Sequence, residues 1–79
     1  MGEHVCVVLD YGWIIEGMVM SRDGGDLRME DASVVRCWRN GRGIGAIADP
    51  AYKDEYTLDP IGNVRVRDSR VLFEIPLGW

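Results

Sequence analysis

The side chains best placed to bind a ligand lie in a glycine-rich segment near the middle of the chain. In "WRNGRGIG", residues 38–45, Arg39 and Arg42 flank the Asn40-Gly41 pair, and Trp38 comes directly before them. Glycines leave backbone N–H groups accessible to an anion, arginine adds a charged planar donor, and an indole ring offers a stacking surface. These residue types favour contact with a phosphate or a nucleotide. The structural alternative is a long connection whose tryptophan caps the core.

Two more arginines alternate with valines near the end of the chain. "GNVRVRDSRVLFEIP", residues 62–76, has apolar residues at alternate positions on both sides of a short polar interruption, which predicts a strand, a tight turn and a strand. Arg65 and Arg67 then share one strand face, from which their guanidinium groups could reach a phosphate or a base. The alternative is a solvated face on which Glu74 of the opposite strand balances their charge.

The sequence offers no apparatus for catalysis or metal binding. No Lys-Ser/Thr follows the last glycine of residues 38–45, so a P-loop is excluded. His4 is the only histidine, near an end of the chain that we expect to be frayed, and Cys6 and Cys37 lack the further ligands of a zinc site. The carboxylates fall mainly at turns, where backbone hydrogen bonding favours aspartate. We therefore expect no enzyme activity, metal or cofactor, and free thiols rather than a disulfide.

Length and charge limit the remaining classes of function. The 79 residues predict one small domain, residues 1–79, whose thin core would gain from self-association, and the apolar tail "IPLGW" could pack against a neighbour. Nine basic and thirteen acidic residues give a net charge of −4, which disfavours a generic polyanion-binding surface and leaves room for a local anion site. No signal peptide or membrane span is predicted, so we expect a soluble, cytoplasmic protein.

Short β-strands must position these residues. Apolar and β-branched residues predict strands over residues 4–10, 13–21 and 27–38, the last being either one long bent strand or two short ones. Gly17 predicts a bend or bulge, and the two glycines within residues 22–26 predict a tight turn.

The second half of the chain is irregular at first and then returns to the strand pattern. Residues 39–55 predict at most one short helical turn near 43–48, and the strand pattern of residues 56–79 contains "DPIGN" as a turn. Five strands of this length predict an all-β fold, a small barrel. Its core is expected to consist mainly of aliphatic residues at alternate strand positions: Val5, Val7, Leu9, Ile15, Val19, Leu27, Val64, Val66, Val71 and Phe73.

The order of these pieces resembles the two signatures of the Sm-like proteins. "HVCVVLDYGWIIEGMVMSRDGGDLRMEDASVV" resembles the first, and "GNVRVRDSRVLFEIP" is similar to the second, which ends its first strand with an arginine. The resemblance implies a five-stranded SH3-like/Sm-like barrel that assembles into a homo-oligomer by pairing of its open edges, expected at the first strand and "VLFEIP". The matching positions of the first signature are Gly12, Gly17, Leu27, Met29, Asp31 and Ala32.

The sequence departs from the Sm-like pattern in the loops that contact RNA. Asp26 stands where the first loop typically has asparagine, and Arg67, the arginine that could stack on a base, is followed by Asp68 instead of glycine. A carboxylate near a phosphate repels it, whereas an amide donates a hydrogen bond. The Sm-like proteins also usually carry an N-terminal helix, whereas the first strand is expected here almost at once, from residue 4. The ring expectation survives these changes, but the uridine-binding expectation is weakened.

The chain also resembles a group of short phage- and prophage-encoded proteins of unassigned function, through "MEDASVVRCWRNGRGIGAIA" and the later "EIP". Two functions therefore compete. In the first, an oligomeric, non-catalytic module, a phage accessory protein, captures a nucleotide or a short RNA. In the second, a phage-encoded inhibitor binds a host defence protein in the host cytoplasm. The ligand residues of the first are Trp38, Arg39, Arg42 and Arg67, and the partner contacts of the second are Asp23, Asp26 and Asp31.

Overall fold

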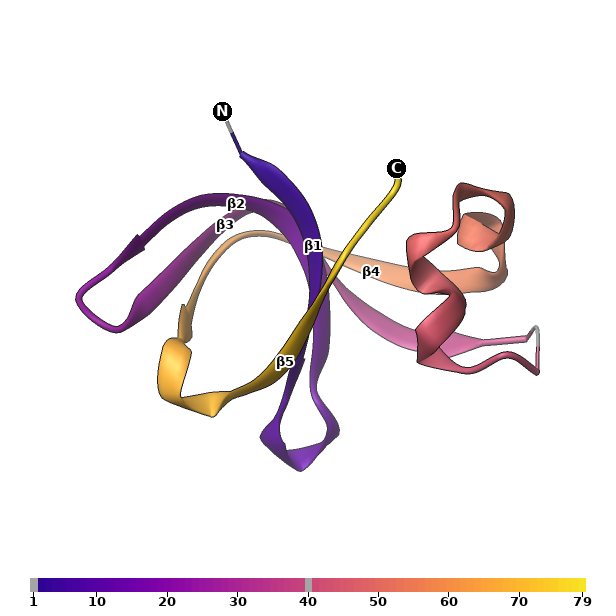
Figure 1. The fold of residues 1–79 in the computed structure, drawn as a ribbon, viewed down its shortest axis with the longest axis horizontal. Helices are drawn as coiled ribbons and strands as arrows, with labels where there is room; N and C mark the ends of the chain where they lie inside the picture. The colour runs from indigo at the N-terminus through magenta and orange to yellow at the C-terminus, as the bar shows by residue number, and fades with distance from the viewer. Residues whose placement is uncertain (1, 40) are drawn as a thin grey trace.

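The computed structural model describes residues 2–39 and 41–79, and this part of the chain forms one antiparallel sheet. The sheet order is β4-β3-β2-β1-β5, and Figure 1 shows its long strands curving so that the sheet wraps around on itself. This confirms the predicted all-β fold of five strands. The strands are β1 (Glu3–Leu9), β2 (Ile14–Asp23), β3 (Asp26–Trp38), β4 (Tyr56–Arg67) and β5 (Val71–Pro76).

Alternating residues of β1 supply two separate cores, one on each face of the sheet. Val5 and Val7 are fully buried in the larger core, whereas Cys6, between them, is buried in the smaller one. The smaller core forms because residues 44–55 and the C-terminal tail cover the face to which Cys6 points. Successive strand residues point to opposite faces, so a strand covered on both sides is apolar throughout.

Most of the predicted core is confirmed, but Phe73 is not part of it. Leu9 and Val71 are Cα partners and pack against the larger core, while Phe73 lies opposite Val8, past a register shift, and is 50% exposed. The extra residue between these two pairs turns Phe73 to the other face of the sheet. Buried as predicted are Val5, Val7, Ile15, Val19, Leu27 and Val66, and Val64 is partly buried against them.

The bulge predicted at Gly17 and the tight turn predicted within residues 22–26 are both present in the structure. Gly17 lies at a register shift between β2 and β3, and a Cβ atom placed there would come within 3.0 Å of Cα of Ala32. Gly24 and Gly25 both have positive φ, 58° and 81°, and close the β2–β3 hairpin in a two-residue turn. Positive φ at both central positions suits the twist of a hairpin and strongly favours glycine.

The bounds of β3 and β4 bear on two predictions, the bent or divided strand at residues 27–38 and the turn at "DPIGN". Residues 27–38 belong to the single strand β3. "DPIGN", predicted as a turn, lies inside β4, because Asp59 and Pro60 continue the ladder with β3 and Gly62, with φ of 80°, accommodates an irregularity in it. Proline is tolerated there because β4 is an edge strand, whose second side needs no hydrogen-bond partner.

The connection between β3 and β4 contains more helical structure than predicted. The helical turn expected near 43–48 is the 3₁₀ helix η2 (Ile44–Ala48). A second one, η3 (Pro50–Glu55), follows it, and Asp49 caps this helix by accepting a hydrogen bond from the N–H of Ala51 at 2.9 Å. Two further 3₁₀ turns, η1 (Asp10–Gly12) and η4 (Asp68–Arg70), connect strands. Asn40 lies outside the described residues.

The C-terminal tail packs on its own chain, contrary to the prediction that it would cover a neighbour. The N–H groups of Leu77 and Gly78 donate to the carbonyl oxygens of His4 and Ala48, each at 2.9 Å. His4 is therefore an ordered member of β1 instead of a frayed end. Both cysteines are free thiols, Cys6 buried and Cys37 exposed. No helix in the described part of the chain is long and apolar enough to cross a membrane.

Candidate nucleic-acid interface

The β2–β3 turn and the connection between β4 and β5 meet at one corner of the sheet. Asp26 and Arg67 are Cα partners, and the N–H of Asp68 donates to the carbonyl oxygen of Gly25 at 2.8 Å. These two contacts bring together loops that are more than forty residues apart in the sequence. The Arg67 side chain is exposed there and, within the described residues, forms no ion pair.

Glu74 does not balance the charge of Arg65 and Arg67, as the sequence had suggested. Its carboxylate accepts two hydrogen bonds from Arg22, at 2.9 and 2.7 Å. These hydrogen bonds raise the pKa of the Arg22 guanidinium, which stays charged. The prediction was wrong because β5 pairs with β1 and not with β4, so Glu74 is far in the sheet order from both arginines.

Trp38, Arg39 and Arg42 lie at the opposite end of the β3–β4 ladder from Arg67. Asp26 and Arg67 pair at one end of this ladder, and Trp38 and Tyr56 pair at the other. In Figure 1 the β2–β3 turn and the η2–η3 connection accordingly lie on opposite sides of the molecule. The four predicted ligand residues therefore divide into two separate places within one chain.

The residues at this second place are partly engaged with their own chain. Trp38 is half-buried in the smaller core, with its ring 6.0 Å from that of Tyr56. The guanidinium of Arg42 lies 4.5 Å from the ring centroid of Tyr52, a cation–π contact. Arg39 is exposed, and its backbone N–H donates to the carbonyl oxygen of Glu55. Trp38 thus caps the core, which was the structural alternative for it.

The predicted acidic contacts also divide. Asp23 and Asp26 are Cα partners that flank the β2–β3 turn, beside Arg67. Asp31 lies further along β3, is exposed and has φ of 51°, at a register shift of the β3–β4 ladder. Asp26 and Arg67 therefore place opposite charges at one corner, whereas Asp31 belongs to another part of the surface.

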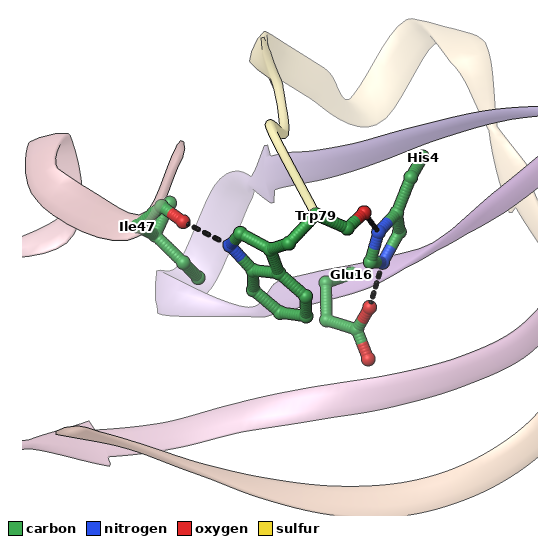
Figure 2. Close-up of polar contacts among 4 residues, drawn as sticks. All are labelled: His4, Glu16, Ile47 and Trp79. Atoms are coloured by element: carbon green, nitrogen blue, oxygen red, sulfur yellow. Dashed lines mark hydrogen bonds and ion pairs between the residues drawn. The ribbon is translucent and has the colours of Figure 1, made fainter. Parts of the chain in front are cut away.

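Sequence reasoning missed a buried polar cluster around His4 (Figure 2). Nε2 of His4 lies 2.5 Å from Oε2 of Glu16, which is only 4% exposed, and Nδ1 hydrogen-bonds with the backbone oxygen of Trp79. The indole N–H of Trp79 donates to the carbonyl oxygen of Ile47 at 2.6 Å. The cluster joins β1, β2, η2 and the tail. The available signal was Glu16, the one charged residue within the run of residues 13–20, a position that calls for a buried partner.

The same cluster keeps Cys6 unreactive. Burial, and secondly the charge of Glu16, raise the pKa of the Cys6 thiol to about 12. The thiolate is the nucleophilic form, so this thiol is inert at neutral pH. The described residues contain no group of three or more His, Cys, Asp or Glu side chains that could hold a metal ion.

Solved structures identify the architecture. A heptameric archaeal Sm protein superposes on this chain with a TM-score of 0.66 and 26% sequence identity, covering 96% of this chain and 87% of the other. The chain has an Sm-like fold. The P. aerophilum SmAP1 heptamer, in a new crystal form, gives the same TM-score and identity, and the match covers 96% of this chain and 80% of that one. No protein-family model matches the sequence. No curated protein matches it either.

The Sm-like fold confirms the first resemblance seen in the sequence and specifies where its two signatures meet. The hairpin turn of the first signature lies at Gly24 and Gly25, and β3 begins after it at Asp26. The strand of the second signature ends at Arg67, which is the Cα partner of Asp26. The resemblance to phage-encoded proteins stays a prediction.

Proposed function

We propose that this protein is a non-catalytic, homo-oligomeric module that binds a short RNA or a nucleotide at the corner formed by Asp26 and Arg67. The observation that carries the proposal is this corner, where an exposed arginine without an ion pair in the described residues lies beside a turn of two glycines. A guanidinium can stack on a base and bind a phosphate in the same place. The similar Sm structures add support, since one was reported for its implications for the eukaryotic snRNP core.

The open edges of the sheet support assembly. β4 and β5 are the outer strands of the sheet, and β1, expected at an edge, is interior. β5 exposes Leu72 and Phe73, which are 66% and 50% accessible, and β4 exposes Ile61. Pairing of β5 with β4 of another copy would satisfy their backbone groups and cover these side chains. The two similar Sm proteins are heptamers, which favours a closed assembly of this kind.

Assembly multiplies the net charge of the single chain, but it also provides several binding sites for one RNA. A net charge of −4 per chain repels a long polyanion, so one corner alone binds weakly. Several copies that contact one RNA raise its apparent affinity through effective concentration. We expect a short RNA to bind better than a long duplex.

Arg39 is a separate contact in this proposal, because it lies at the far end of the β3–β4 ladder. At that end Trp38 contacts the ring of Tyr56, and Arg42 forms a cation–π contact with Tyr52. A ligand that reaches both ends must be longer than a nucleotide.

The test is fluorescence anisotropy with a labelled short oligoribonucleotide, after light scattering has given the oligomer mass. Arg67→Ala should weaken binding about tenfold or more, because a guanidinium that contacts a phosphate contributes roughly 1.5–3 kcal/mol. Arg36→Ala is the matched control, since Arg36 is paired with Asp59 at 3.0 Å, away from the corner. The logarithm of the binding constant should fall linearly with the logarithm of salt concentration.

Failure of the wild type to bind any RNA or nucleotide would refute this function. The protein-binding alternative would then be tested with Asp23→Asn, Asp26→Asn and Asp31→Asn. No described feature favours a host protein as partner at present.

A further inference from the structure

A hollow of about 370 Å³ lies on the β2–β3–β4 part of the sheet, and Arg65, one of the two alternating arginines of β4, lines it. Its polar lining comes from three strands: Ser21 of β2, Arg28 and Glu30 of β3, and Asn63 and Arg65 of β4. Neither Asp26 nor Arg67 lines it. The volume is in the range of small-molecule sites and exceeds what a single phosphate needs.

Irregular pairing on both sides of β3 shapes this hollow. The β2–β3 ladder shifts between Val19 and Ser21, so Met20 has no opposite residue, and Met20 lines the hollow. The β3–β4 ladder shifts between Met29 and Ala32 at nearly the same level of β3. Bulges of this kind bend strands and redirect side chains, and they often lie beside functional sites.

Two arginines of the hollow lie opposite each other and form no ion pair within the described residues. Arg28 and Arg65 are Cα partners on adjacent strands, and like charges directly opposite destabilise a sheet. The ion pairs found among the described side chains involve Arg22, Arg36, Arg70 and His4, and neither Arg28 nor Arg65. Glu30 lines the same hollow but pairs with neither arginine in the described structure.

We propose that this hollow binds a phosphate group, held between the Arg28 and Arg65 guanidiniums. Two guanidiniums supply charge-assisted hydrogen bonds, and the Asn63 amide and the Ser21 hydroxyl add neutral donors. An anion placed between the arginines reduces the repulsion between their like charges. Glu30 opposes the anion and keeps its affinity moderate. The site is distinct from the corner at Arg67, which does not line the hollow, and its phosphate belongs either to a free nucleotide or to an RNA backbone.

The probe is inorganic pyrophosphate, titrated into ¹⁵N-labelled full-length protein and followed by NMR. We expect saturable shifts of the Asn63 side-chain amide and of the Arg28 and Arg65 Nε–H signals. Arg28→Gln combined with Arg65→Gln should weaken binding about tenfold or more, because charge-assisted hydrogen bonds are lost. Glu30→Gln should tighten it severalfold. Arg36→Gln, which removes an arginine outside the hollow, should change nothing.

The spectrum of each variant shows whether it is folded. The site would be overturned if pyrophosphate caused no chemical-shift changes in the wild type, or if it caused the same changes in the folded double variant. Loss of pyrophosphate binding in Arg67→Ala would also overturn it, because the anion would then belong to the corner. Titrations with ATP and with a short oligoribonucleotide distinguish the two sources of the phosphate. Chemical-shift changes with ATP alone support a free nucleotide. Changes at both Arg65 and Arg67 on adding the oligoribonucleotide support the RNA backbone.

Discussion

His4 and Glu16 form a nearly buried pair across β1 and β2, with Nε2 of the imidazole 2.5 Å from Oε2 of the carboxylate. Both ring nitrogens of His4 lie against oxygen atoms, Nε2 against the Glu16 carboxylate and Nδ1 against the backbone oxygen of Trp79. This pair lies under Trp79, whose ring meets the imidazole edge-on at 4.7 Å. It therefore connects the first strand to the last residue of the chain.

Replacing His4 should destabilise the fold much more than replacing an exposed neighbour. His4→Ala leaves the Glu16 carboxylate buried without its partner, which costs about 3 kcal/mol of the free energy of unfolding. Glu3→Ala, at an exposed position of the same strand, is the control and should change it by less than about 0.5 kcal/mol. Urea unfolding followed by circular dichroism measures both. Equal stabilities of the two variants would show that the pair contributes nothing.

Gly17 should not tolerate a side chain. A Cβ atom there would lie 3.0 Å from both Cα and Cβ of Ala32, so Gly17→Ala forces β2 and β3 apart at a cost of roughly 1–3 kcal/mol. Gly45→Ala is the matched control, because no atom other than those of its chain neighbours and of its own helix backbone lies within 4 Å of the added carbon. Thermal unfolding should show a lower midpoint for the first variant and little change for the second. The opposite order would mean that the two strands do not pack as closely as described.

The two thiols should differ in reactivity. Ellman's reagent should modify Cys37, which is exposed, and should reach Cys6 only when urea is added, because that thiol is buried and its pKa is raised to about 12. Modification of both thiols at equal rates under native conditions would contradict the buried position of Cys6. Cys37→Ser, which leaves only the slow thiol, assigns the rates.

The raised pKa of Cys6 also predicts a loss of stability in alkali. The folded thiol keeps its proton to about pH 12, whereas the unfolded one releases it near 9.0. The unfolded state therefore gains from ionisation as the pH rises above about 9, and the free energy of unfolding falls. Cys6→Ala removes this contribution, so its stability should decline less between pH 9 and 11 than that of the wild type. Parallel declines would exclude the thiol as the cause.

The period-two pattern predicted strands such as β3 because one face is buried, and β1, covered on both faces, was predicted by its β-branched residues. The paired glycines predicted the hairpin because few residues accept positive φ. The period-two pattern failed where the register of strand pairing decides which face of the sheet a side chain lies on. Phe73 has the type and spacing of a core residue, but a register shift beside Val8 turns it outward. Arg67 and Arg42 have similar chemistry, yet the long β3–β4 ladder separates their loops. Such relationships depend on which strands pair, and a pattern local to one strand does not contain them.

The outward Phe73 leads to the prediction that bears on assembly. If β5 pairs with β4 of another copy, as we propose, Phe73 and Leu72 are covered in the oligomer although they are exposed in the single chain. Leu72→Asp combined with Phe73→Asp places charges on the open edge, and charged edges resist pairing. The variant should sediment as a monomer of 8.9 kDa and keep the circular dichroism of the wild type. Tyr11→Asn alters another exposed aromatic residue, whose φ of 59° asparagine adopts readily, and should leave the oligomer intact. An unchanged oligomer in the double variant would place the interface elsewhere, and a monomeric wild type would remove the basis for binding RNA through several copies.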